Sequence, residues 1–242
     1  MNPTAVIVIT LAGGVGACRN APGQPAPGSE VKNPATVNDF ATLYAANCAG
    51  CHGTGGKGGA AIALNDPVYL AVAGDGTIRR VISNGVPWTA MPAFARGAGG
   101  LLTDEQVEAI VNGIRTRWAR PDGLQGAIAP PYSAAQSGDP GRGRTVYDTW
   151  CASCHGADGR GGARASSIVD GSYLALVSDQ ALRTIVIVGR PELGAPDWRN
   201  NLPGHPMSGE DVTDVVAWLA AQRTEAPGQP YPAPQPIAGR TQ

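Results

Sequence analysis

The sequence predicts two small helical units in tandem, and an internal duplication is the main evidence for them. Two blocks of similar length, residues 37–118 and 141–225, carry the same features in the same order. Each has a tyrosine four residues before a C-x-x-C-H motif, a glycine-rich loop after it and a second tyrosine further on. Each ends in an amphipathic segment that begins with a capping signal, Thr103-Asp-Glu-Gln or Ser208-Gly-Glu-Asp. We therefore expect a helix before each motif, one or two in the middle and one at the end.

The chain starts with a stretch that we interpret as a targeting segment, residues 1–17. Its apolar core, Ala5 to Ala17, has 13 residues, which is too short for a bilayer span of about 20 but suits a signal peptide. Small residues come directly before Cys18, as in a bacterial lipobox, where cleavage leaves a lipidated cysteine at the N-terminus. No Lys or Arg precedes the apolar core, and the alternative is an ordinary signal peptide with Cys18 as a spare thiol. We expect lipidation of Cys18.

Three stretches rich in proline, glycine and alanine flank and separate the two blocks. Their composition is typical of flexible linkers. The sequence APGQP occurs in both the first and the last of them. We therefore expect a tether at 18–36, a linker at 119–140 and a tail at 226–242, with folded domains at 37–118 and 141–225.

Each block carries one C-x-x-C-H motif. Two thiols three positions apart on a helical turn can reach the two vinyl groups at one edge of a porphyrin, and the adjacent imidazole can bind the iron as fifth ligand. A zinc site would need four ligands, yet the two cysteine pairs lie in separate blocks and the chain has only three histidines. A thioredoxin-type pair would not need the histidine. The motifs predict two haem c groups, attached through Cys48, Cys51, Cys151 and Cys154, with His52 and His155 as iron ligands.

A sixth ligand for the first iron is expected at Met91, which follows His52 by 39 residues. An isolated methionine more often fills a gap in a core. This one lies in a loop bracketed by Pro87 and Pro92, just before the last helix of the block. A stiff loop can hold a soft thioether against iron at little entropic cost. His/Met ligation also raises the reduction potential relative to bis-His ligation.

The two haems are expected to differ, because the second block has Ala195 where the first has Met91. Alanine cannot bind iron. The remaining candidates are Met207, which we favour, and then His205; both lie just before the final helix. Met207 aligns with Leu102, so packing against the start of that helix is its alternative role. An open or water-bound iron is the third alternative.

Two other recurring features have more than one interpretation. Arg79 and Arg183 recur in register in the middle of each block, and they could pair with haem propionates or be solvated helix residues. The glycine-rich loops after each histidine, residues 53–59 and 156–162, lack the Gly-Lys-Ser/Thr of a phosphate-binding loop. We interpret them as turns where the backbone passes close to the porphyrin.

The two haem motifs, the Met-Pro sequence before a terminal helix, and that helix itself resemble class I cytochromes c. Leu64-Asn-Asp-Pro, Met91-Pro-Ala-Phe and Pro196-Asp-Trp-Arg are similar to sequences of bacterial dihaem cytochromes c, and the resemblance covers nearly all of residues 37–225. It implies an all-α fold of two tandem class I cytochrome c domains, each wrapped around one covalently bound haem c. It also implies haem edges exposed at each domain surface, which accept and donate single electrons.

We therefore expect an electron-transfer protein, not an enzyme, at the outer face of a bacterial membrane. Haem attachment to this motif takes place outside the cytoplasm in bacteria, so the protein should be exported and periplasmic or otherwise extracytoplasmic. A lipid anchor with a flexible tether would hold it near membrane partners, which we expect to be a quinol-oxidising or other dehydrogenase complex and an oxidase or other terminal acceptor. The formal net charge of −1 and the lack of Lys or Arg runs argue against nucleic acid. The alternative is a haem enzyme, peroxidase-like or small-ligand-binding, with an open sixth position at the second haem.

Overall fold

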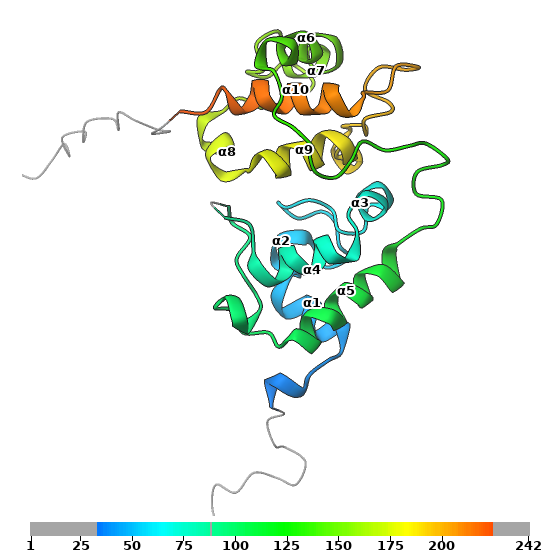
Figure 1. The fold of residues 1–242 in the computed structure, drawn as a ribbon, viewed down its shortest axis with the longest axis vertical. Coiled ribbons are helices and arrows are strands. Elements are labelled where there is room, and N and C mark those ends of the chain that lie inside the picture. The colour runs from blue at the N-terminus through cyan, green and yellow to red at the C-terminus, as the bar shows by residue number, and fades with distance from the viewer. Residues whose placement is uncertain (1–32, 88, 225–242) are drawn as a thin grey trace, which may run out of the picture. The chain divides into compact units, whose positions relative to one another are not determined.

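The computed structural model describes residues 33–87 and 89–224, and Figure 1 shows the course of the chain. Regular structure in these residues consists of α-helices and short 3-10 helices, with isolated bridges but no strands. The all-α prediction is confirmed. The predicted signal peptide, the predicted lipidation site at Cys18 and the tail at 226–242 lie outside the described residues.

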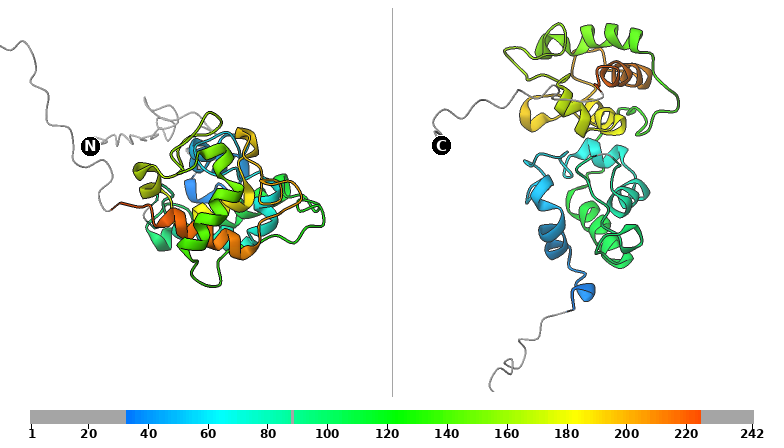
Figure 2. Two further views of the ribbon diagram at one scale, coloured as in Figure 1. Left: turned by 90° about the horizontal axis from the view of Figure 1, so that it is seen from above. Right: turned by 90° about the vertical axis from the view of Figure 1, so that its left-hand side faces the viewer.

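The chain divides into a short unit, Met1–Thr36, and a large one, Val37–Gln242. The described part of the short unit contains a 3-10 helix, η1 (Pro34–Thr36). The large unit contains both repeats, which have the same order of helices: one before the motif, one turn that carries the motif, two in the middle and one at the end. Figure 2 shows these helices from two further sides. The first repeat comprises α1 (Phe40–Asn47), α2 (Ala49–His52), α3 (Pro67–Val72), α4 (Asp75–Asn84), η2 (Arg96–Ala98) and α5 (Asp104–Trp118). The second comprises α6 (Pro140–Trp150), α7 (Ala152–His155), α8 (Gly171–Leu176), α9 (Asp179–Val188), η3 (Pro191–Leu193) and α10 (Gly209–Ala220).

Both final helices begin at the predicted capping signals. Thr103 Oγ1 accepts a hydrogen bond from the Gln106 N–H (3.2 Å), and Gln106 Oε1 accepts one from the Thr103 N–H (3.0 Å). Ser208 and Asp211 form the same pair of bonds, 3.1 and 2.8 Å long. A cap of this kind contributes about 1 kcal/mol. It also fixes the residue at which the apolar face of each helix starts.

The predicted apolar faces of the final helices lie at the centre of each core. The α5 helix contacts α1 and α4, and α10 contacts α6 and α9. The buried residues of these faces are those expected from their helical spacing, and each contributes roughly 1.5–3 kcal/mol by leaving water. They are Val107, Ile110, Val111 and Ile114 in α5, and Val212, Val215, Val216 and Leu219 in α10. Among the described residues, no helix combines the length and apolarity needed to cross a membrane.

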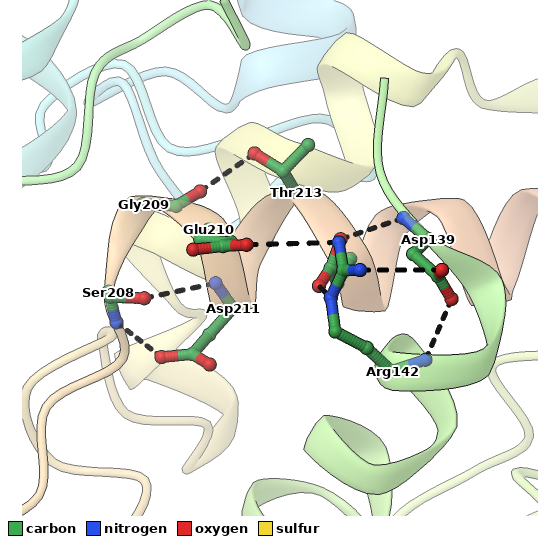
Figure 3. A network of polar contacts seen from close by, with 8 residues as sticks. Asp139, Arg142, Ser208, Gly209, Glu210, Asp211 and Thr213 are labelled. Atoms are coloured by element: carbon green, nitrogen blue, oxygen red, sulfur yellow. Dashed lines mark hydrogen bonds and ion pairs between the residues drawn. The ribbon is translucent and has the colours of Figure 1, made fainter. Parts of the chain in front are cut away.

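A polar network joins the first and last helices of the second repeat (Figure 3). Asp214 of α10 is buried, and its carboxylate accepts hydrogen bonds from Arg142 Nε (2.7 Å) and from the Asp139 N–H (2.7 Å). Arg142 also lies 3.8 Å from the carboxylate of Glu210. Burial alone would raise the pKa of Asp214, but these hydrogen bonds and the charge of Arg142 hold that pKa below its ordinary value. The network fixes the start of α6 against α10.

An arginine in the last turn of α5 holds the corner between the two middle helices of the first repeat. Arg115 donates hydrogen bonds to the carbonyl oxygens of Leu70 and Ala73 and pairs with the carboxylate of Asp75. The carbonyls of Leu70 and Ala73 belong to α3 and its C-cap, and Asp75 is the first residue of α4. One side chain therefore ties α5 to both.

Arg223, just beyond α10, makes the equivalent contacts in the second repeat. It donates to the carbonyl oxygens of Leu174 (3.1 Å) and Val177 (2.8 Å) and pairs with Asp179. Each of these acceptors follows its counterpart by 104 residues, whereas the two arginines are 108 residues apart. The acceptors therefore occupy equivalent positions in the two repeats, whereas the two arginines do not.

The linker between the repeats is hydrogen-bonded to the second repeat along its second half. The Pro131 carbonyl accepts from Arg183 Nε (3.0 Å), and the Tyr132 carbonyl accepts from Gln180 Nε2 (2.7 Å). Both donors are on α9, and the Arg183 side chain is buried beneath this segment. Residues 131–139 are therefore held on the second repeat, although their composition alone suggests a free chain.

Candidate functional site

The first C-x-x-C-H motif lies on a single helical turn directly after α1. Cys48 ends α1 and begins α2 with a φ of −118°, and its carbonyl accepts hydrogen bonds from the N–H groups of Cys51 (3.2 Å) and His52 (3.0 Å). The two thiols are thus nearly one helical turn apart, and the imidazole follows the second thiol. The Tyr44 hydroxyl donates to the Gly53 carbonyl (2.8 Å), which holds the residue after the histidine against α1.

The second motif repeats this geometry. Cys151 has a φ of −117°, and its carbonyl accepts from the N–H groups of Cys154 (3.1 Å) and His155 (3.0 Å). The Tyr147 hydroxyl donates to the carbonyl of Gly156. The sequence duplication therefore extends to the hydrogen bonds that shape each motif.

Both histidines use the same ring nitrogen to bond the backbone. Nδ1 of His52 lies 2.8 Å from the Ile62 carbonyl oxygen, and Nδ1 of His155 lies 2.9 Å from that of Ser166. A carbonyl can only accept, so Nδ1 carries the hydrogen and Nε2 has its lone pair available. Burial lowers the pKa of His52, which favours the neutral imidazole that a metal requires.

In the described part of the chain, the four motif cysteines form no disulfide bond. Burial, followed by the charge of the neighbouring cysteine, raises the pKa of Cys48 to about 11 and that of Cys151 to about 12. A raised pKa disfavours the thiolate at Cys48 and Cys151, whereas a thioredoxin-type pair lowers the pKa of its reactive cysteine. Within residues 33–87 and 89–224, no three His, Cys, Asp or Glu side chains gather as a metal site would require. Two thiols and one available imidazole nitrogen in each repeat fit haem c.

A tryptophan from each final helix packs on the tyrosine that precedes the motif. The rings of Tyr44 and Trp118 meet edge to face, with centroids 5.2 Å apart, and those of Tyr147 and Trp218 stack at 4.3 Å. Each ring pair connects the final helix to the motif, and such a pair adds about 0.5–1.5 kcal/mol beyond its buried area.

Met91 lies in a tight loop that starts at the C-cap of α4. The Val86 N–H donates to the Met91 carbonyl (3.0 Å), which closes the loop, and the Met91 N–H donates to Thr89 Oγ1 (3.2 Å). Gly85 has a φ of +66°, and a Cβ there would lie 2.6 Å from the Met91 carbonyl oxygen, so the loop requires glycine at this position. The N–H and the carbonyl of Met91 are therefore both hydrogen-bonded within this loop.

The corresponding loop of the second repeat places Ala195 at the position of Met91. The Arg190 N–H donates to the Ala195 carbonyl (2.9 Å), which is the counterpart of the bond from Val86. The Met207 side chain is 2% exposed and belongs to the apolar core. His205 is exposed, and its carbonyl accepts a hydrogen bond from Trp150 Nε1 (2.9 Å). The structure thus separates the two sequence candidates: one lies inside the core and the other on the surface.

Several functional contacts could not be found by residue type. The carbonyls of Ile62 and Ser166 orient the histidines, but every residue has a carbonyl, and only the loop length determines which one is used.

Arg79 pairs with the carboxylate of Glu108 on α5. Arg183 donates to the Pro131 carbonyl and to Thr213 Oγ1 (2.8 Å). Both arginines are therefore engaged with the final helix of their own repeat.

A family model and several known proteins are similar to this sequence. The family model described as "Cytochrome C oxidase, cbb3-type, subunit III" matches the chain twice, at residues 35–112 and 138–219. The cbb3-type cytochrome c oxidase subunit CcoP of Azospirillum sp. (strain B510) is 34% identical over 136 residues, which cover 52% of this chain and 40% of the relative. Subunit FixP of Sinorhizobium medicae is 30% identical over 183 residues, or 71% of this chain and 56% of the relative. The cytochrome bc1 complex cytochrome c subunit of Mycobacterium tuberculosis is 26% identical over 231 residues, which cover 92% of this chain and 76% of the relative. The chain thus spans only 40% and 56% of the length of the two cbb3-type relatives.

Proposed function

We propose that this chain, which belongs to the family described as cytochrome c oxidase, cbb3-type, subunit III, is a dihaem electron-transfer protein. Each of its two segments that match the family model contains one C-x-x-C-H motif. The chain binds two c-type haems. The observation that carries the proposal is repeated in both domains: a histidine follows two cysteines on one helical turn, with its Nδ1 bonded to a backbone carbonyl and its Nε2 available.

The residues of each motif have three tasks. The thiols attach the haem covalently, the imidazole binds iron through Nε2, and the carbonyl at Nδ1 fixes the tautomer and ring orientation and raises the basicity of the ligand. When bound, the haem iron supplies the one-electron couple. We assign attachment to Cys48 and Cys51 in the first repeat and to Cys151 and Cys154 in the second, with His52 and His155 as the iron ligands.

Met91 is the proposed sixth ligand of the first haem. The proposal is supported by the closed loop from Val86 to Met91, since a fixed backbone limits the entropic cost of holding the thioether in place. For the second haem, the sequence favours Met207 and then His205, and the third alternative is an open or water-bound iron.

The proposed partners are membrane-bound redox complexes. The relatives are named as subunits of cbb3-type oxidases and of a cytochrome bc1 complex, which supports a quinol-oxidising complex or an oxidase as partner. An extracytoplasmic position and a lipid anchor at Cys18 are proposed from the apolar segment and the small residues before that cysteine.

Haem retention and electron exchange test the function. The full chain, produced with a c-type maturation system, should keep both haems on a denaturing gel stained for haem, and its intact mass should include both. Replacement of Cys51 and His52 together should leave one haem, and the matched pair Cys154 and His155 should do the same. The reduced protein should be oxidised by respiratory membranes of its host. A chain that retains both haems yet exchanges no electrons with such membranes would contradict the proposal.

The anchor has a separate test. The mature protein should begin at Cys18 and fractionate with membranes, and the Cys18→Ser variant should be either soluble or left with its signal segment uncleaved. Identical fractionation and N-terminal mass in the two forms would remove the lipoprotein proposal and leave the redox function intact.

A further inference from the structure

The two loops before the final helices share one backbone design. Gly85 (φ +66°, ψ −166°) and Gly189 (φ +73°, ψ −168°) end α4 and α9 in the same conformation. The next N–H, of Val86 or Arg190, bonds the carbonyl five residues further on. A Cβ at Gly189 would lie 2.7 Å from the Ala195 carbonyl oxygen, as one at Gly85 would lie 2.6 Å from that of Met91. The structural equivalence of positions 91 and 195 therefore rests on backbone contacts as well as on sequence.

At this shared position the second repeat lacks the chemical group that can bind iron. Met91 carries a thioether on a flexible arm, whereas Ala195 ends at its Cβ and has no lone pair to donate. The loop around Ala195 is closed by two hydrogen bonds, from the Arg190 N–H to the Ala195 carbonyl (2.9 Å) and from the Ala195 N–H to the Arg190 carbonyl (3.0 Å). The loop thus keeps its shape without the ligand.

Met207 has the structural role that Leu102 has in the first repeat. Each is the last residue before an N-cap, and each is nearly fully buried, at 2% and 6% exposure. The Met207 N–H donates to the Trp198 carbonyl (3.0 Å), and the Leu102 N–H donates to the Phe94 carbonyl (2.8 Å). Leucine cannot bind a metal, so the role that the two positions share is packing. Packing alone therefore accounts for the burial of Met207.

His205 is tied to the surface of the second repeat. Its N–H donates to the Leu202 carbonyl (3.0 Å), and its carbonyl accepts from Trp150 Nε1 (2.9 Å). The side chain is exposed. Backbone bonds on both sides of the residue oppose the movement that would carry its imidazole inward.

We propose that the second haem has no strong side-chain ligand opposite His155 and that small exogenous ligands bind there. The ligand class is that of compact haem ligands: carbon monoxide when the iron is reduced and cyanide when it is oxidised. Binding displaces at most a water molecule and transfers no electrons. The inference rests on the proposed function only in requiring that both haems be attached.

Carbon monoxide titration of the reduced, dihaem protein tests the proposal. We expect about one carbon monoxide per chain, because one haem is open and the other is closed by Met91. The Met91→Ala variant should bind about twice as much, which shows that the assay detects an opened site. The Ala195→Met variant should restore a thioether at the shared position, abolish the uptake and strengthen the weak near-infrared sulfur-to-iron band of the oxidised protein.

The Met207→Leu variant is the matched control, because it introduces the residue that the first repeat has at this position. Uptake and spectrum should be unchanged. Absence of carbon monoxide uptake by the wild-type protein with both haems retained would overturn the inference and leave the electron-transfer function standing. Uptake that appears only in Met207→Leu or His205→Ala would overturn it too, and would identify that residue as the ligand. Haem content is measured first, since a chain with fewer than two haems contradicts the proposed function itself.

Discussion

The ring of Phe40 occupies the space that a side chain at Gly113 would need. A Cβ at Gly113 would overlap that ring, so α1 and α5 cross where one residue is large and the other has no side chain. In the second repeat the sizes are exchanged. Gly143 aligns with Phe40 and Trp218 with Gly113, and a Cβ at Gly143 would overlap the Asp214 carbonyl oxygen and lie 2.8 Å from Trp218 Cβ. The first and last helices cross closely in both repeats. The large residue lies on the first helix in the first repeat and on the last helix in the second.

Gly113→Ala should therefore destabilise the first repeat. The new methyl overlaps the Phe40 ring, and overpacking of this kind costs about 1–3 kcal/mol, which exceeds the ~1 kcal/mol that alanine gains over glycine in a helix. Denaturant unfolding of the haem-loaded protein measures the change. Gly76→Ala in α4 is the control, because a Cβ there meets nothing within 4 Å and should be neutral or stabilising. Equal effects of the two substitutions would show that the crossing is looser than described.

Arg115→Met should loosen the corner between α3 and α4. The substitution keeps a long apolar stem but removes the donors to the carbonyls of Leu70 and Ala73, at a cost of about 1–3 kcal/mol. Amide hydrogen exchange of α3 and α4 should accelerate before that of α1. Arg120→Met should leave exchange unchanged, because Arg120 is exposed and its guanidinium, within the described part of the chain, bonds the adjacent Ala119 carbonyl (3.2 Å). Protection of α3 that survives in Arg115→Met would contradict the proposed tie.

Asp214→Asn should change how stability depends on acid. The folded-state pKa of Asp214 lies below its ordinary value, so the ionised carboxylate contributes stability above the unfolded-state pKa of about 4. This contribution is lost as the pH falls through the folded-state pKa. The variant should have a lower Tm than the wild type at pH 7, and the difference should shrink toward about pH 3. A Tm difference that is constant over this range would mean that protonation of Asp214 is not linked to folding.

Met207→Ala should cost about as much as Leu102→Ala, roughly 2–5 kcal/mol each, because both remove a buried side chain at the same place before a final helix. Parallel unfolding curves of the two variants measure this. The two reduction potentials of Met207→Ala should stay near those of the wild type if the residue only packs. A large shift of one potential with little loss of stability would indicate iron ligation.

The sequence alone predicted the elements whose determinants are local. The final helices, their caps and their apolar faces depend on residues within a few positions of one another, and the motif turns likewise depend on a short fixed pattern. The equivalence of Ala195 and Met91 could also be predicted, because each follows the glycine that ends the preceding helix, Gly189 or Gly85, by the same number of residues.

Contacts between distant segments could not be predicted in the same way. The acceptors for Arg115, Arg223 and the two histidines are backbone carbonyls, which have no signature in the sequence. The linker has the composition of a free chain, yet its Pro131 and Tyr132 carbonyls bond two side chains of α9 that lie far along the sequence. Such pairings are determined by tertiary packing.

Arg115 and Arg223 do not occupy equivalent positions, so the final helix of one repeat cannot replace that of the other without loss of contacts. If the segment 208–223 replaced 103–118 in the register of the caps, the position of Arg115 would receive Ala220, and Arg223 would arrive three residues later. Three residues correspond to about 4.5 Å along a helix axis and to a rotation of roughly 60° about it. The Leu70 and Ala73 carbonyls would lose their donor, and Trp218 would meet Phe40 instead of Gly143. Recombination between the two halves of the coding sequence would therefore produce mismatched helix pairs, so each half must evolve as a unit with its own final helix.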